Sequence, residues 1–188
     1  VNYFAEQSFF WNGLSASLGV SGNWNTMYGH NVAGGANIGY EYAKDSRVYL
    51  NANRSLRLPT FTDLFYNAGN QLGDRNLRPE SAWTISLGTQ YNHLFAQEKK
   101  DAIAHRISVS ADAYYRFGEN IIDWVYVPED TKRPFHATNH NRVNAAGLEA
   151  SVRYTYNSWL RQVSVNYAYT YLDLDLSASG SSCQTRTA

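Results

Sequence analysis

The sequence predicts an all-β fold, an antiparallel meander of about eight long strands that form part of a transmembrane β-barrel. Three observations predict this fold. Apolar and polar residues alternate in segment after segment, many segments reach about ten residues, and aromatic residues gather towards the segment ends. Ten residues at about 3.4 Å each, tilted by about 40°, rise roughly 26 Å, which matches the apolar band of an outer-membrane barrel.

The alternating segments follow one another along most of the chain. Residues 14–21 show the pattern clearly, because one face would carry only Leu, Ala and Val while the other would carry only Ser and Gly. Residues 1–9 form a partial strand by the same criterion. The abundance of Tyr, Phe and Trp also favours sheet over helix. The predicted strands are 1–9, 14–21, 32–42, 47–53, 81–94, 105–117, 147–156 and 161–171.

The connections between these segments alternate in length. Residues 10–13, 44–46 and 157–160 predict tight turns, whereas residues 56–80 and 119–144 predict two loops of about 25 residues each. Outer-membrane barrels combine short periplasmic turns with long external loops, so the strands that lead into the long loops would point outwards. The turn predicted at 95–104 is longer than this scheme prefers, and its core is polar.

Composition excludes several classes of protein. Sixteen basic and sixteen acidic side chains cancel, so no net field would attract nucleic acid. The single cysteine, Cys183, excludes an internal disulfide framework. Asn, Ser and Gly interrupt every apolar stretch, so a membrane-spanning helix is not expected. The chain begins without Met and without a signal peptide, and we expect it to start inside a longer protein.

The residues between the fourth and fifth predicted strands resemble a known family. The runs L-R-L-P-T-F-T-D-L-F-Y-N-A-G-N (56–70) and D-R-N-L-R-P-E-S-A-W (74–83) are similar to a segment of TonB-dependent outer-membrane receptors. Asn76, Leu77, Pro79 and Glu80 match the family's Asn-Leu-x-Pro-Glu element, while Asp74 and Arg75 stand where the family has Asn and Pro. Further resemblances lie at residues 3–7, 18–20, 118–124 and 144–149.

This resemblance implies a 22-stranded barrel, filled by a plug, in the outer membrane of a Gram-negative bacterium. It also implies TonB-dependent uptake of a scarce nutrient such as a ferric siderophore or cobalamin. The expected partners are the nutrient, the TonB complex through a plug that this chain lacks, and outer-membrane lipid. Residues 1–176 would be the partial barrel and residues 177–188 a non-barrel tail. The two open edges of the partial barrel would close into a small barrel, pair between copies or meet further chains.

Candidate binding residues lie in the two long predicted loops, where aromatic surfaces mix with polar groups. In the receptors that the chain resembles, external loops are expected to capture the ligand. Glu41, Asp112, Arg116, Glu149 and Arg153 fall on the polar parity, where we expect ion pairs between neighbouring strands. The predicted ligand-binding residues are Phe65, Tyr66, Asn67, Asn70, Arg75, Asp123, Trp124, Tyr126 and Arg142.

Two other functions stay open from the sequence. A soluble or surface-exposed β-sandwich, acting as a binding or adhesion domain, would show the same alternation. An enzyme on a small outer-membrane barrel would need a catalytic cluster at the rim. The sequence presents no such cluster, so it predicts neither an enzyme nor a bound cofactor. His136 and His140 could share a zinc ion on a helix, but they lie in an Asn-rich polar stretch, which favours a solvated loop.

Overall fold

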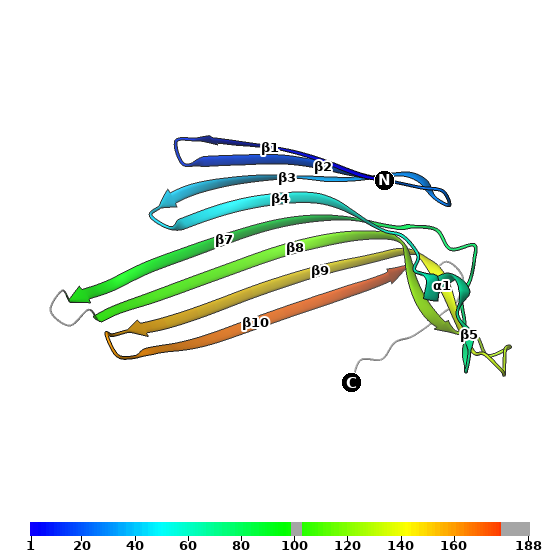
Figure 1. Ribbon diagram of the computed structural model, residues 1–188. Coiled ribbons are helices and arrows are strands. Elements are labelled where there is room, and N and C mark those ends of the chain that lie inside the picture. Colours follow the sequence, from blue (N-terminus) through cyan, green and yellow to red (C-terminus); the bar gives the residue numbers. More distant parts are fainter. Residues whose placement is uncertain (99–102, 178–188) are drawn as a thin grey trace.

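A computed structural model describes residues 1–98 and 103–177 of the 188-residue chain. Within these residues the protein forms one antiparallel sheet and one short helix, which confirms the predicted all-β fold (Figure 1). No helix in this part of the chain is long and apolar enough to cross a membrane. The elements are β1 (Asn2–Trp11), β2 (Leu14–Asn25), β3 (Gly29–Ala43), β4 (Ser46–Arg57), α1 (Phe61–Phe65), β5 (Asn67–Ala68), β6 (Gln71–Leu72), β7 (Glu80–Glu98), β8 (Ile103–Tyr126), β9 (Phe135–Asn157) and β10 (Gln162–Ser177).

The long strands form a meander in which each pairs with its neighbours in sequence, from β1 through β4 to β7, β8, β9 and β10. The short β5 and β6 form a hairpin at one end, and β6 runs parallel to the start of β9. The eight long strands match the predicted number. The predicted tail, 177–188, lies outside the described residues except for Ser177, which ends β10.

The two ends of the sheet differ. One end, which we call the turn end, carries two-residue connections such as Asn12–Gly13, where both residues have a positive φ (45° and 81°) that suits a tight hairpin. The other, the loop end, carries α1, the β5–β6 hairpin and the connection between β8 and β9 (Figure 1). The short connections at the turn end agree with the prediction, and so does the long connection 58–79 at the loop end.

The loop predicted at 119–144 is wrong. The β8–β9 ladder continues without a register change to Tyr126 and Phe135, so that only residues 127–134 connect the strands. Residues 136–142 are mostly polar on both faces of the strand, so a search for alternating apolar residues did not detect this pairing. Residues 95–98 likewise continue β7, and β8 begins at Ile103, so most of the predicted 95–104 turn is strand or lies outside the described residues.

The sheet is open and has a single layer. The edge strands β1 and β10 lie at opposite margins and do not pair with each other (Figure 1). The described residues therefore do not close into a small barrel, which was one of the three expected outcomes. The sandwich alternative is also wrong, because all long strands belong to one sheet and no second sheet covers it among the described residues. Large apolar side chains such as Leu18, Leu87 and Val165 are therefore exposed, at 66%, 56% and 63%.

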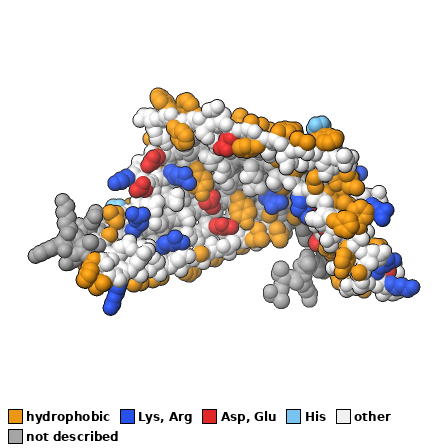
Figure 2. Space-filling view, viewed as in Figure 1, with side chains coloured by type: hydrophobic (Ala, Val, Ile, Leu, Met, Phe, Trp, Pro, Cys, Tyr) orange, Lys and Arg blue, Asp and Glu red, His pale blue; other side chains and the backbone are white. Residues whose placement is uncertain are grey.

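Register separates the two faces of the sheet. Leu50, Leu87, Ala113 and Leu148 follow one another across β4, β7, β8 and β9 on an apolar face. The adjacent row, Tyr49, Gly88, Asp112 and Glu149, lies on a polar face. Figure 2 shows charged side chains gathered over the middle of the visible face. The alternation in the sequence therefore became two chemically distinct surfaces.

The buried core of the described residues sits at the loop end. Leu64 of α1, Leu77 of the following loop, Ile122 of β8 and Ala137 of β9 are buried together. Phe65 and Trp124 pack against this group. The core therefore fixes the loop 58–79 onto the extended β8–β9 hairpin.

Candidate ligand-capture site at the loop end

The site begins where β4 stops. Arg57 ends the strand, and Pro59, which has no N–H to donate, follows two residues later and is buried. Thr60 then caps α1: its hydroxyl accepts from the Asp63 backbone N–H at 3.2 Å, and the Asp63 carboxylate accepts from the Thr60 N–H at 2.8 Å. This reciprocal capping box starts the helix. The prediction that Pro59 ends strand pairing is confirmed.

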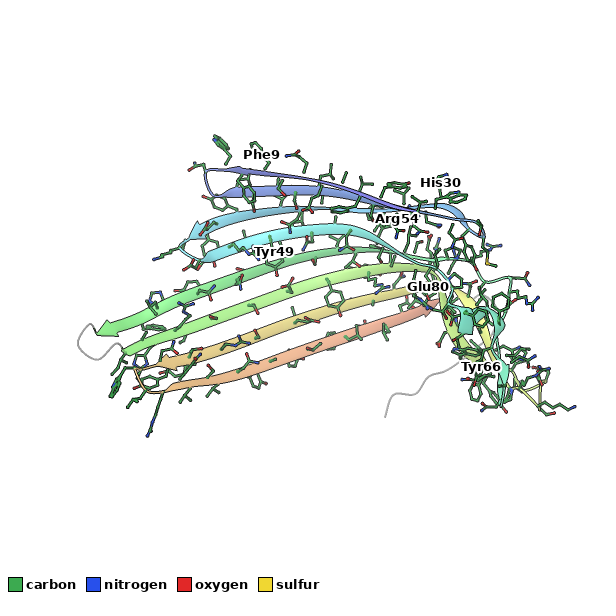
Figure 3. All side chains as sticks on the ribbon, viewed as in Figure 1. Phe9, His30, Tyr49, Arg54, Tyr66 and Glu80 are labelled. Atoms are coloured by element: carbon green, nitrogen blue, oxygen red, sulfur yellow. The ribbon has the colours of Figure 1, made fainter. Side chains whose placement is uncertain are left out.

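A charged cluster ties this turn to the sheet. The Arg57 guanidinium donates to Asp63 at 3.2 Å and to Glu80 at 2.5 Å. The same Glu80 oxygen, Oε1, accepts from the backbone N–H of Ile122 at 2.8 Å. Asp63 and Glu80 are both buried, whereas the Arg57 side chain stays 45% exposed. We call Arg57, Asp63 and Glu80 the clamp, because they join β4, α1 and β7 to β8. Glu80 is labelled in Figure 3 at the loop end of the sheet.

A second device holds the segment before β7. The side-chain amide of Asn139 on β9 accepts from the Arg78 N–H at 2.8 Å and donates to the Arg78 carbonyl at 3.0 Å. It also donates to the Asn120 carbonyl at 2.7 Å. From the β2–β3 turn, the Tyr28 hydroxyl donates to the Leu77 carbonyl at 3.3 Å. Sequence reasoning missed these partners, because Asn139 lies some sixty residues from the segment that it binds.

Several of the predicted aromatic residues come together beside the buried core of the loop end. The rings of Tyr66 and Trp124 meet edge-on with centroids 6.4 Å apart, although Tyr66 follows α1 in the loop and Trp124 lies on β8. The Arg75 guanidinium lies 5.0 Å from the centre of the Phe65 ring. Tyr66 is 40% exposed and is labelled in Figure 3 near the end of the loop. Aromatic surface and a cation are thus presented side by side.

Two of the predicted polar residues, Asn67 and Asn70, contact the segment that leads into β9. Asn67 accepts from the Arg133 guanidinium at 2.5 Å, and the Asn70 carbonyl accepts from the Phe135 N–H at 3.1 Å. These contacts join the loop 58–79 to the 127–134 turn and to the start of β9. Tyr126 packs on Phe135 with centroids 5.6 Å apart.

Two predicted residues stand apart from these contacts. The Asp123 carboxylate accepts only from the next N–H, that of Trp124, at 2.7 Å among the described residues. Arg142 lies on β9 opposite Glu119 in the ladder, further down the strand. Asp123 therefore adjoins the cluster, while Arg142 does not belong to it. We call Phe65, Tyr66, Asn67, Asn70, Arg75, Trp124 and Tyr126 the loop-end cluster.

The turn at 127–134 has its own fixed carboxylate. Asp130 accepts from the N–H groups of Arg133 and Lys132 at 3.0 and 3.1 Å, and its other oxygen lies 3.2 Å from Nε2 of His136. The Arg133 N–H chiefly, and then the His136 side chain, lower the pKa of Asp130 below its ordinary value. Sequence reasoning did not single out this turn.

Comparison with known proteins gives the chain a family. The model of the TonB dependent receptor-like β-barrel family matches residues 1–186. The chain belongs to this family. No curated protein matched it. Members of the family are outer-membrane transport receptors of Gram-negative bacteria rather than enzymes.

In the barrel of a TonB-dependent receptor the polar face lines the lumen and the apolar face meets lipid. The ion pairs expected on the lumenal face do not form among the described residues. Asp112 instead accepts from the Tyr49 hydroxyl and stands opposite Glu149 in the ladder. The ion pairs among the described residues lie at the loop end.

No group of three or more His, Cys, Asp or Glu side chains within residues 1–98 and 103–177 could hold a metal ion. His136 and His140 lie on strand β9 rather than in the predicted loop, and His136 faces Asp130. The loop-end cluster presents aromatic rings, an arginine beside a phenyl ring and side-chain amides.

Proposed function

We propose that the intact protein imports a scarce nutrient, such as a ferric siderophore or cobalamin, across the outer membrane of a Gram-negative bacterium. Residues 1–176 supply part of the barrel wall, and the loop-end cluster is the first surface that the nutrient touches. Energy reaches the receptor from the TonB complex through the plug of the intact protein. Outer-membrane lipid covers the apolar face.

The observation that carries this proposal is the contact between Tyr66 and Trp124. One ring comes from the loop after α1 and the other from β8, and they meet where the clamp and Asn139 hold the loop against the sheet. A preformed surface spends less binding energy on ordering its own side chains, so a dilute ligand can be held. Arg75 and Asn67 add a cation and an amide for the anionic and carbonyl groups that siderophores and cobalamin carry.

Trp124 provides the direct test. The purified intact receptor would be titrated with ferric siderophores and with cyanocobalamin while tryptophan fluorescence is recorded. We expect saturable quenching by one of these ligands and its loss in Trp124→Ala. Trp159→Ala is the matched control, because Trp159 is exposed at the turn end, away from the cluster.

Growth separates binding from transport. Cells that rely on this receptor for the quenching ligand should grow only when TonB is functional, and Trp124→Ala should raise the ligand concentration needed for growth. Quenching that persists in Trp124→Ala and vanishes in Trp159→Ala would place capture at the wrong end of the barrel. Growth that does not depend on TonB would reject the transport mechanism.

A further inference from the structure

The apolar face contains a hollow that the capture site does not use. It has a volume of about 750 Å³ and lies over β1 to β4 and the start of β7. Leu18, Ala36, Ala52 and Ile85 form one ladder row across this face, and the two alanines leave the floor low between larger neighbours. Gly34, in the next row, deepens it. The volume falls in the range of pockets that hold small organic ligands.

A charged side chain borders this hollow. Arg54 stands between Gly34 on β3 and Trp83 on β7 in the ladder, on the face that carries Ala52 and Leu50. It is exposed and takes part in no salt bridge with any residue that the structure describes. Figure 3 labels Arg54 near the loop end of the strands.

No acidic side chain that borders the hollow on this face neutralises the charge of Arg54. Glu6 of β1 also borders the hollow, but alternation directs its side chain to the face opposite that of Ala5 and Gln7. The lining is otherwise without Asp or Glu. Arg54 is therefore a cation on the apolar face with no protein counter-charge beside it among the described residues.

The level of Arg54 in the wall indicates what meets it. Trp83 is followed in the same ladder row by Phe117 on β8, and both rings are about half exposed. Aromatic residues on the lipid face mark the interface between hydrocarbon and head groups. β4 ends shortly afterwards at Arg57. Arg54 thus lies at the head-group level of the outer leaflet, and the hollow extends from it towards the hydrocarbon.

We propose that Arg54 and this hollow bind a phosphate-bearing acyl lipid of the outer leaflet. The guanidinium pairs with the lipid phosphate through two parallel hydrogen bonds, and an acyl chain fills the hollow below. An unpaired cation facing lipid is costly, and an unfilled depression forfeits dispersion contacts, so one ligand satisfies both requirements. This inference rests on the membrane location in the proposed function.

The test measures how tightly the intact receptor binds diphosphorylated lipid A in detergent, by native mass spectrometry. We expect Arg54→Gln to weaken binding roughly tenfold, as the loss of a charge-assisted pair predicts. Ala52→Leu keeps the charge but fills the floor, and it should also weaken binding. Arg153→Gln is the matched control, because Arg153 is an exposed arginine on the opposite face.

Several outcomes would overturn the inference. Equal binding by Arg54→Gln and the unaltered receptor would do so, as would an equal loss in Arg153→Gln. Competition by inorganic phosphate alone, or burial of the face by a second copy of the receptor in place of lipid, would show a different occupant. A first experiment checks that the receptor extracted from membranes is a folded barrel, by asking whether heating changes its migration in an SDS gel. If this change is absent, the proposed function fails; if it is present, a negative lipid result rejects only this inference.

Discussion

Arg57 and Glu80 lie opposite each other in the β4–β7 ladder, and their side chains are joined by a hydrogen bond of 2.5 Å. Because Glu80 also accepts from the Ile122 N–H, one buried carboxylate connects β7 to the strands on both sides. Glu80 follows Arg57 by 23 positions in sequence, and the intervening segment 58–79 is the whole loop with α1. The family-like sequence at 56–80 is thus a loop closed upon itself by charge.

Glu80→Ala should loosen the loop end. The change leaves the Ile122 N–H without a buried acceptor, which costs roughly 1–3 kcal/mol. Because Arg57 is 45% exposed, the lost ion pair adds little beyond that. Hydrogen exchange of the intact receptor should show faster exchange at Ile122. Glu129→Ala, an exposed acid in the β8–β9 turn, serves as the control; equal protection in both variants would refute the clamp.

Asn139→Ala should release the segment before β7. Three hydrogen bonds to backbone groups of Arg78 and Asn120 disappear together, so residues 74–79 should become sensitive to limited proteolysis. Asn139→Asp keeps the acceptor for the Arg78 N–H and should show an intermediate effect. A cleavage rate in Asn139→Ala equal to that of the unaltered receptor would show that this amide does not hold the segment.

Gly88→Ala should disturb the lumenal wall. A Cβ at Gly88 would meet the Tyr49 ring at 2.5 Å and Asp112 Oδ1 at 2.6 Å, so the Tyr49–Asp112 hydrogen bond must shift. We expect the free energy of unfolding, measured with urea for the receptor in lipid vesicles, to fall by roughly 1–3 kcal/mol. Gly19→Ala is the control, because its Cβ would have no neighbour closer than 4.0 Å. Equal midpoints would contradict the close approach.

Acidification should release the 127–134 turn. The hydrogen bonds from Arg133 and His136 lower the pKa of Asp130 in the folded protein below its ordinary value, so the stabilisation is fully present above that ordinary value. It is lost as the pH falls through the folded pKa. The Arg133 N–H should therefore exchange faster only in strong acid, after correction for intrinsic exchange, while Asp130→Asn should remove this pH dependence. A transition near neutral pH would contradict the assignment.

The isolated chain should associate through its edges. β1 and β10 each leave one row of backbone groups unpaired in the open sheet, and β10 exposes Val163, Val165 and Tyr167. Sedimentation in detergent should give species larger than one chain, in proportions that depend on concentration. A stable monomer that keeps the open sheet would contradict this expectation.

Much of the wall could be predicted from the sequence, because alternation reports directly which side chains share a face. Pro59 marked the end of β4 for an equally local reason. The extension of β8 and β9 was missed because residues 136–142 are mostly polar on both parities. The clamp was missed in part: Glu80 stood out as a motif residue, but its contacts with Arg57 and Ile122 depend on the register of three strands.

Surface labelling of intact cells tests most directly whether this chain is a receptor wall with its capture cluster outside. In the intact receptor with Cys183→Ser, Glu129→Cys would place a thiol in the β8–β9 turn and Trp159→Cys one at the turn end. A membrane-impermeant maleimide should label the first variant in intact cells and the second only after the outer membrane is opened. Labelling of Trp159→Cys alone in intact cells, or of both variants equally, would contradict the orientation and the capture site with it.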